Sequence, residues 1–249
     1  MSNKISMFSV NSYNIIITGG SRGIGQALAQ GFSIAGANVV ILDINPPEHK
    51  GDYQYFNCDL GNQDHIKAVL NRIFSGGFTP KVLINCAAVT IPGPSHQYPD
   101  ADWRKSISVN LDGVFTLCRE VSKVMIGLGI SGSIINFTSI GAEQGFANNP
   151  GYAATKGAVK QLTKALAVEW GEHNIRVNNI VPGYTKTPMN SKSWNDPLLK
   201  KQRSDHTVFG RWAEPEEMVG PAIFLASDAS SYITGIDLIV DGGWLVKGM

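Results

Sequence analysis

Hydrophobic residues occur along this chain in short runs that end at a glycine or at a polar side chain. Each run has the length of a β-strand, and aliphatic, β-branched or aromatic residues dominate it. These runs predict strands at residues 14–18, 38–42, 53–57, 81–85, 133–137, 176–181 and 237–240. Between them, apolar residues recur every three or four positions, as on one side of a helix.

Helices are therefore predicted between the strands, at residues 26–32, 63–74, 102–128 and 151–170, and another is predicted to begin at 213–217. Strands that alternate with helices form a parallel sheet covered by helices, so the fold class is α/β. The chain has 249 residues, which lies within the range of one α/β domain. We expect a single domain over residues 1–249.

A glycine-rich turn joins the first strand to the first helix. The strand ends at Thr18, and the stretch from Gly19 to Gly25 leads into the helix. Glycines let the backbone approach a pyrophosphate closely, and the N-terminus of the following helix attracts the anion. The same pattern also occurs as a tight turn without a ligand, so this segment alone leaves both interpretations open.

The residue after the second strand bears on the type of dinucleotide. Asp43 can accept hydrogen bonds from the adenosine ribose hydroxyls. It would repel a 2′-phosphate about 4 Å away by on the order of 4 kcal/mol at an effective dielectric near 20. Arg22, in the glycine turn, could instead hold that phosphate. We give Asp43 more weight and expect NAD(H) to be favoured over NADP(H).

Two further segments follow predicted strands. Asp59 follows the third strand, where it could meet the adenine amino group or cap the turn into the next helix. Small side chains at residues 86–88 follow the fourth strand, where they allow a ligand to approach the backbone or simply pack well.

A tyrosine and a lysine lie four residues apart in the predicted helix 151–170. Tyr152 and Lys156 would share one face of that helix, one turn apart. A cation within a few Å lowers the pKa of an acidic group by about 1–3 units, so Lys156 is expected to lower the pKa of Tyr152. The pair alone is also typical of a solvated helix face. Small residues at 153, 154, 157 and 158 favour close approach of another helix, as in a subunit contact.

Two polar residues occupy positions that point to the same chemistry. Ser139 follows the fifth strand, at the carboxyl edge where open α/β sheets bind ligands, and its hydroxyl could donate to a substrate carbonyl. Asn110 lies within the apolar face of helix 102–128. It could be a satisfied core amide or a bridge between backbone and water in a proton path.

Residues 183–212 have weak periodicity and form a long predicted loop. Loops of this length are generally lids or binding segments, so this one is expected to cover the substrate. Its aromatic residues could close over a ligand while its basic residues stay in solvent.

The composition of the chain indicates which kinds of binding partner to expect. The formal net charge is +1, so no basic field indicates nucleic acid. The three cysteines are widely spaced and predict neither a disulfide framework nor a metal site. No stretch approaches a membrane span of about 20 apolar residues. We expect a cytoplasmic protein that acts on a small molecule.

Together, these motifs make the chain resemble a short-chain dehydrogenase/reductase from about residue 14 to residue 244: Thr18 to Gly25, Asn85, Asn110, Ser139, Tyr152, Lys156 and Pro182-Gly183. The resemblance implies a single Rossmann-type domain, doubly wound around a parallel sheet of about seven strands with helices on both faces. It also implies a homotetramer.

The resemblance assigns roles to four residues. Tyr152 would be the general acid/base, and Lys156 would hold the nicotinamide ribose and lower the pKa of Tyr152. Ser139 would position the carbonyl or alcohol, and Asn110 would support a water relay. Cofactor contacts are implied for Gly19, Ser21, Arg22, Gly23, Ile24, Gly25, Asp43, Asp59, Leu60, Asn85, Ala87, Tyr152, Lys156, Pro182, Gly183, Thr185 and Thr187.

One segment departs from the family pattern. The family usually has Asn-Asn-Ala-Gly after the fourth strand, whereas this chain has Asn85-Cys86-Ala87-Ala88, so cofactor packing there is expected to differ slightly. None of the four catalytic positions is lost, which argues against a non-catalytic, dinucleotide-binding regulatory protein.

The substrate is indicated only by the last part of the chain. Residues 210–226 and 240–245 resemble members that act on sugar acids and polyols, such as gluconate and deoxygluconate dehydrogenases. The expected reaction is the NAD(P)(H)-dependent interconversion of a secondary alcohol and a ketone. The alternative is a 3-oxoacyl carrier-protein reductase that uses NADPH, which Asp43 disfavours and Arg22 partly favours.

Overall fold

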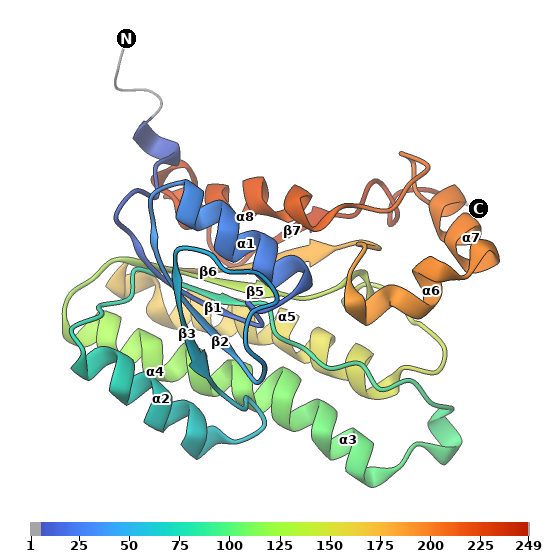
Figure 1. The fold of residues 1–249 in the computed structure, drawn as a ribbon, viewed down its shortest axis with the longest axis horizontal. Helices are drawn as coiled ribbons and strands as arrows, with labels where there is room; N and C mark the ends of the chain where they lie inside the picture. The colour runs from blue at the N-terminus through green and yellow to red at the C-terminus, as the bar shows by residue number, and fades with distance from the viewer. Residues whose placement is uncertain (1–5, 249) are drawn as a thin grey trace.

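In the computed structural model, which describes residues 6–248, one parallel sheet runs through the molecule (Figure 1). Its strand order is β3-β2-β1-β4-β5-β6-β7, and every neighbouring pair is parallel. The strands are β1 (Asn14–Thr18), β2 (Asn38–Asp43), β3 (Tyr53–Asn57), β4 (Val82–Asn85), β5 (Gly132–Phe137), β6 (Ile175–Pro182) and β7 (Asp237–Val240). Each predicted strand is confirmed to within one residue at either end.

Helices cover both faces of the sheet, which confirms the doubly wound α/β fold. One face packs against α1 (Gly23–Ile34) and α8 (Val219–Ala226). The other packs against α2 (Gln63–Ser75), α4 (Gly113–Gly127) and α5 (Pro150–Trp170). Short 3-10 turns lie at Ser6–Phe8, Ser95–Gln97, Ile140–Ala142, Gly171–His173, Pro188–Asn190, Pro215–Met218 and Asp228–Ser230.

The predicted continuous helix 102–128 is wrong in one respect. The structure has α3 (Asp100–Ile107), a wide π turn (Ser108–Asp112) and α4 in its place. Asn110 lies in this turn, where its side chain pairs with both backbone groups of Val89. The next turn lies against Leu60, because a Cβ on Gly113 would come within 2.5 Å of the Leu60 carbonyl oxygen. Contacts with distant segments therefore accompany the irregular turn.

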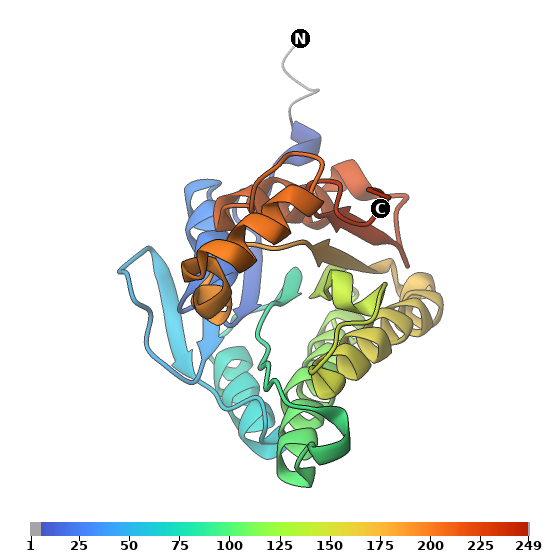
Figure 2. The same ribbon diagram turned by 90° about the vertical axis from the view of Figure 1, so that its right-hand side faces the viewer.

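The predicted loop 183–212 also contains regular structure that its weak periodicity concealed. It forms α6 (Ser191–Asn195) and α7 (Pro197–His206), which lie beyond the carboxyl ends of the strands (Figures 1 and 2). The Asp196 side chain caps α7 by accepting hydrogen bonds from the backbone of Leu198 and Leu199. Asp196 followed by Pro197 is a helix-start signal in the sequence.

A row of polar side chains crosses four neighbouring strands of the sheet. Asn85, Asn136, Asn179 and Asp237 are register partners on β4, β5, β6 and β7. Asn85 donates to Asn136 at 2.8 Å, and Asn179 donates to Asp237 at 2.7 Å. Thr163 of α5 joins the two halves, because it accepts from Asn136 at 2.8 Å and donates to Asn179 at 2.7 Å. The row thus attaches α5 to the sheet.

We predict that Asn136→Ala destabilises the protein strongly. The change leaves Asn85 with only the weakly accepting Cys118 sulfur and Thr163 without a donor, and both side chains lie in the interior. Each buried polar group left unsatisfied costs about 1–3 kcal/mol, so the free energy of unfolding should fall by about 2–5 kcal/mol. Urea denaturation followed by circular dichroism measures this change.

Asn14→Ala is the matched control, because its side chain bonds the Thr79 carbonyl where water can replace it. It should cost less than about 1.5 kcal/mol. Equal and small losses in the two variants would contradict a stabilising role for the row.

Candidate active site

Tyr152 and Lys156 lie in the first two turns of α5, at the carboxyl edge of the sheet. Lys156 is only 3% exposed, and its Nζ donates a hydrogen bond of 2.6 Å to the Phe137 carbonyl oxygen at the end of β5. The same nitrogen lies 5.6 Å from the centre of the Tyr152 ring. The tyrosine and the lysine therefore form one site, as their spacing predicts, and the lysine is buried rather than solvated.

Ser139 joins this pair from the loop after β5. Its hydroxyl accepts a hydrogen bond of 3.0 Å from the backbone N–H of Gly141, which fixes the start of the short 3-10 turn. The Ser139 side chain also forms a hydrogen bond with Tyr152 that favours the tyrosinate. Two hydroxyl groups thus lie together at one point of the carboxyl edge, where both can face the same substrate oxygen.

The predicted lowering of the Tyr152 pKa by Lys156 is wrong for the protein without ligand. Burial raises the pKa of Tyr152 from its ordinary value of 10.0, and the hydrogen bond from Ser139 opposes this only in part. Burial also lowers the pKa of Lys156 to about 8. Desolvation disfavours the charged form of each group, so both pKa values shift toward the neutral form.

Asn110 is fully buried and connects two segments beside Tyr152. Its Oδ1 accepts from the Val89 N–H at 2.8 Å, and its Nδ2 donates to the Val89 carbonyl at 2.9 Å and to Thr155 at 3.3 Å. Thr155 in turn donates to the Tyr152 carbonyl at 2.9 Å. The side chain therefore acts as a satisfied amide that ties the segment after β4 to α5.

The glycine turn forms a cradle against the segment after β4. Gly19 has a positive φ of 70°, and a Cβ there would lie 2.8 Å from Ala87 Cα. A Cβ on Gly25 would lie 2.0 Å from the Gly19 carbonyl oxygen. The hydroxyl of Thr18 accepts from the backbone of Cys86 at 3.1 Å and of Ala87 at 3.2 Å. Only glycine fits at both positions, which leaves exposed backbone for a pyrophosphate at the start of α1.

The loop after β6 completes the cradle on its far side. A Cβ on Gly23 would lie 3.4 Å from the Thr187 side chain, so the glycine turn and Thr187 face each other. Ile24 packs against the core beneath this turn. These residues come from distant parts of the sequence and fit a dinucleotide.

Asp43 lies next to the glycine turn, as predicted. Its carboxylate accepts hydrogen bonds of 3.1 Å from the backbone N–H groups of Ser21 and Asn45. The Ser21 hydroxyl donates to the Asn45 carbonyl at 2.6 Å. Arg22 is exposed at the N-cap of α1, and its side chain makes no capping bond there. The negative charge is therefore fixed by backbone bonds, whereas the positive charge is held on the surface.

Several predicted cofactor residues use their side chains elsewhere. The Asn85 side chain belongs to the buried polar row and is 2% exposed, and Leu60 lies in the core. Asp59 accepts from Gly61 N–H at 2.9 Å, so it caps that turn, while Asn62 caps α2. The Thr185 hydroxyl donates to the Gly183 carbonyl at 3.2 Å.

Two residues beside the cofactor site were not among the predicted cofactor contacts. Thr18 supports the backbone after β4, and its place between strand and glycine turn was the available signal. Cys86 lies near Lys156, and burial raises the pKa of its thiol to about 12, so it is neutral. The sequence indicated that Cys86 is small and that it lies in the segment that departs from the family pattern.

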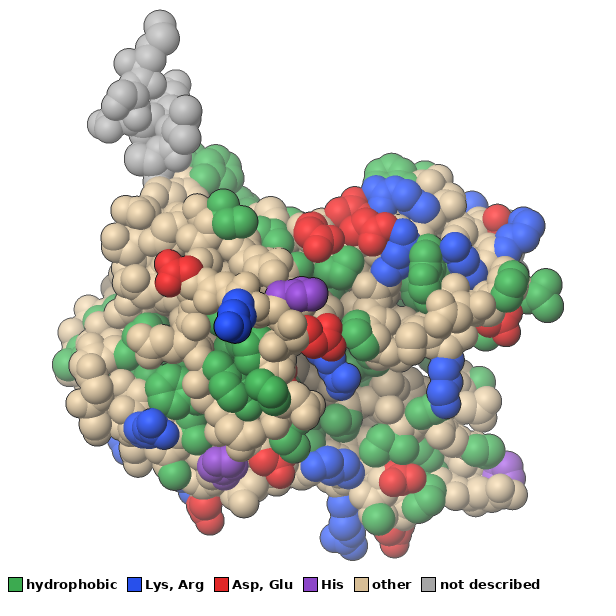
Figure 3. All heavy atoms as spheres, viewed as in Figure 1, with side chains coloured by type: hydrophobic (Ala, Val, Ile, Leu, Met, Phe, Trp, Pro, Cys, Tyr) green, Lys and Arg blue, Asp and Glu red, His purple; other side chains and the backbone are tan. Residues whose placement is uncertain are grey.

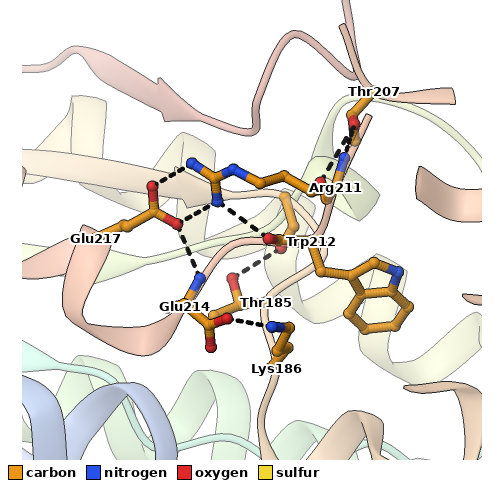
Figure 4. A network of polar contacts seen from close by, with 8 residues as sticks. Thr185, Lys186, Thr207, Arg211, Trp212, Glu214 and Glu217 are labelled. Carbon is orange, nitrogen blue, oxygen red and sulfur yellow. Dashed lines mark hydrogen bonds and ion pairs between the residues drawn. The ribbon is translucent and has the colours of Figure 1, made fainter. Parts of the chain in front are cut away.

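Polar contacts anchor the C-terminal end of segment 183–212 (Figure 4). The Arg211 guanidinium forms two bonds of 2.7 Å to the Glu217 carboxylate, which lower the pKa of Glu217 to about 2. Glu217 also accepts from the Glu214 N–H, and Glu214 pairs with Lys186. Trp212 is 2% exposed beneath this network. The C-terminal end of the segment is therefore held in place by these contacts.

Other kinds of site find no support in residues 6–248. These residues contain no cluster of His, Cys, Asp and Glu that could hold a metal ion. None of the helices described is both long and apolar enough to cross a membrane.

A Rossmann-type sheet with a glycine cradle and a Ser, Tyr and Lys site defines a dinucleotide-dependent oxidoreductase. Comparison with known proteins agrees. A family model described as enoyl-(acyl carrier protein) reductase matches residues 19–245. The chain belongs to the short-chain dehydrogenase/reductase family, and its activity is that of an NAD- or NADP-dependent oxidoreductase on a CH–OH group.

Two relatives and one solved structure illustrate the similarity. The chain is 34% identical to 2-dehydro-3-deoxy-D-gluconate 5-dehydrogenase of Pseudoalteromonas atlantica, over 97% of this chain and 99% of that protein. It is 32% identical to D-threitol dehydrogenase of Mycolicibacterium smegmatis, over 96% and 95% of the two chains. The structure of a gluconate 5-dehydrogenase from Burkholderia cenocepacia with NADP and tartrate matches with a TM-score of 0.92 and 33% identity, covering 97% and 98%.

We predict that Tyr152 stays protonated to above pH 10 in the ligand-free protein. Because burial raises its pKa from 10.0, the tyrosinate forms only at higher pH than for an exposed tyrosine. The near-ultraviolet absorbance of tyrosinate, taken as the difference between wild type and Tyr152→Phe during a pH titration, measures this. A midpoint well below pH 10 that disappears in the variant would show that Lys156 outweighs burial.

Proposed function

We propose that this protein interconverts a secondary alcohol and a ketone on a sugar acid, a polyol or a similar small molecule. The observation that carries the proposal is the meeting of the Ser139 and Tyr152 hydroxyls beside the buried ammonium of Lys156. The names of the relatives support the substrate class, since they act on deoxygluconate and threitol.

Tyr152 is the general acid/base in this proposal. A protonated phenol donates to the substrate oxygen during ketone reduction, and the tyrosinate accepts the proton during alcohol oxidation. Ser139 donates a hydrogen bond to the same oxygen, where negative charge develops. The nicotinamide, when bound, supplies or accepts the hydride.

Lys156 and Asn110 support this proton transfer. The Lys156 ammonium is held by the Phe137 carbonyl and lies under the Tyr152 ring, from which position it binds the nicotinamide ribose. Asn110 holds the backbone around Val89 and, through Thr155, the first turns of α5. In this proposal Asn110, held in this position, supports a relay of water molecules that carries the proton.

Segment 183–212 forms the substrate cover in this proposal. Its helices α6 and α7 lie beyond the carboxyl ends of the strands, and the surface is indented below them (Figure 3). The buried Trp212 and the Arg211–Glu217 pair fix its C-terminal end. Closure would therefore involve α6, which is partly exposed, more than the anchored end.

There are two alternative functions, an enzyme with a different substrate and a protein of another class. A 3-oxoacyl carrier-protein reductase would use the basic side chains of segment 183–212 to dock an acidic carrier protein. A regulatory dinucleotide-binding protein would keep the fold without turnover. The complete set of Asn110, Ser139, Tyr152 and Lys156 favours an enzyme over the regulatory alternative.

We predict that Tyr152→Phe abolishes most of the activity. Removal of the proton donor should lower kcat by about 10²–10⁴-fold while NADH still binds. The measurement is the absorbance of reduced cofactor over a panel of sugar acids, polyols, ketoses and a 3-oxoacyl thioester. Tyr232→Phe is the control, because that side chain is fully exposed.

The panel of substrates distinguishes the proposed function from its two alternatives. Turnover of sugar acids or polyols supports the proposed substrates, and turnover of the thioester alone supports the carrier-protein alternative. Tight NADH binding without turnover of any compound by wild type would favour the regulatory alternative.

NAD(H) is the preferred cofactor in this proposal, because Asp43 is held beside Ser21 by two backbone hydrogen bonds. A carboxylate so fixed can accept from ribose hydroxyls but repels a 2′-phosphate. The Burkholderia cenocepacia relative binds NADP, so relatives of this fold also accept the other dinucleotide.

We predict that Asp43→Asn shifts the preference toward NADPH. The amide keeps the size of the side chain and one acceptor but removes the charge that repels the phosphate. The ratio of kcat/KM for NADPH to that for NADH should rise by about 10- to 1,000-fold, since a like-charge contact at an effective dielectric near 20 is worth up to about 4 kcal/mol. Asp64→Asn, at an exposed position of α2, should leave the ratio unchanged. A wild-type preference for NADPH would contradict the assignment.

A homotetramer in the cytoplasm completes the proposal. Small residues on α5 leave room for a second helix, and Val168 on the same helix is an exposed apolar side chain. The mass in solution tests the assembly.

A further inference from the structure

Arg203 carries a charge that the described part of the chain does not neutralise. It lies on α7, half buried, with its guanidinium carbon 4.5 Å from the centre of the Tyr184 ring and 5.7 Å from that of Trp212. Within residues 6–248, no carboxylate oxygen lies within 4.0 Å of its nitrogens. A half-buried guanidinium with no anionic partner is unusual, because desolvation of a charge is normally offset by pairing.

Each of the other lysines and arginines around α6 and α7 is either paired or exposed, and Lys192 is exposed. Lys186 pairs with Glu214, and Lys201 pairs with Asp205 at 2.5 Å. Lys200 lies 3.8 Å above the Trp194 ring. Arg211 is bound by Glu217, as described above. Arg203 differs from them because it is partly buried and has no carboxylate partner, its contacts being with the rings of Tyr184 and Trp212.

The rings that support Arg203 lead directly to the catalytic site. Tyr184 lies two residues after Pro182, the last residue of β6. Its ring packs edge-on against Phe146, with 6.4 Å between the ring centres. Phe146 and Ser139 flank Gly141, since a Cβ there would lie 3.3 Å from Phe146 Cδ2 and 3.4 Å from Ser139 Oγ. Ser139, Phe146, Tyr184 and Arg203 thus follow one another along the wall that joins the reacting oxygen to α7.

The other polar groups on this wall are few. Tyr184 is neutral, because burial raises its pKa even though the charge of Arg203 opposes the rise. His206 stacks on Trp244 at 4.2 Å. The backbone of α7 beyond Arg203 is held by Lys247, whose Nζ donates to the carbonyls of Asp205 and Thr207. Arg203 thus presents its charge from a fixed helix.

We propose that Arg203 binds the carboxylate of the substrate, so that the substrate is a sugar acid rather than a neutral polyol. A planar guanidinium matches a carboxylate with two parallel hydrogen bonds, and a helix that is anchored at its end holds it in place. In this proposal the carbon chain of the substrate runs along the wall from Ser139 to Arg203, with the reacting carbinol at one end and the carboxylate at the other. This inference rests on the proposed function and narrows its substrate class.

The test compares an acid with its uncharged analogue. Steady-state kinetics with NAD⁺ are measured for D-gluconate and D-glucitol with wild type, Arg203→Met and the control Lys201→Met, whose side chain is exposed and paired with Asp205. Arg203→Met should raise KM for D-gluconate by roughly 10- to 100-fold, the range of a hydrogen bond to a charged group, with little change in kcat. D-Glucitol kinetics and the control should change little.

A binding experiment separates this inference from the proposed function. Tryptophan fluorescence reports D-gluconate binding to the NADH complex in the Tyr152→Phe background, because Trp212 lies beside Arg203. Saturable binding that Arg203→Met removes supports the inference, even if wild type oxidises neither compound and the proposed function fails. Equal kinetic losses on both substrates, or unchanged binding in Arg203→Met, overturn the inference while turnover by wild type upholds the proposed function.

Discussion

The attachment of α5 to the sheet is the constraint on which the site depends. Thr163 bonds to Asn136 of β5 and Asn179 of β6, and these belong to a polar row that reaches from β4 to β7. Lys160, one turn earlier, pairs with Glu143 and lies 3.5 Å from Asp237. Such bonds are directional, unlike hydrophobic contacts, so they fix both the position and the rotation of the helix. One turn further back, Lys156 is thereby brought to the Phe137 carbonyl.

Burial has opposite effects on the two groups that share this helix face. It raises the pKa of Tyr152 and lowers that of Lys156 to about 8, so both move toward their neutral forms. A neutral phenol suits the donation of a proton to a ketone, whereas alcohol oxidation needs the tyrosinate. The Ser139 hydrogen bond already favours that ion, and a positively charged nicotinamide beside the site would favour it further.

The carboxyl edge of the sheet also joins two binding functions on one side of the molecule. The glycine turn, the segment after β4 and Thr187 form the cradle for a dinucleotide, while Ser139, Tyr184 and α7 form the wall on the substrate side. The loop after β6 takes part in both, since Tyr184 and Thr187 are three residues apart. A change in this loop would therefore affect cofactor and substrate together.

The sequence by itself determined the strands, the glycine turn and the spacing of Tyr152 and Lys156, because these are local patterns that follow from backbone geometry and periodicity. It also indicated that Ser139 and Asp43 follow strands, and the structure confirms that both lie at the carboxyl edge. The tertiary structure alone decided that the pKa of Tyr152 is raised, that a π turn at Ser108–Asp112 separates α3 from α4, and that the Asn85 side chain points inward. Each of these depends on burial or on bonds between residues far apart in the chain, and no local pattern records such contacts.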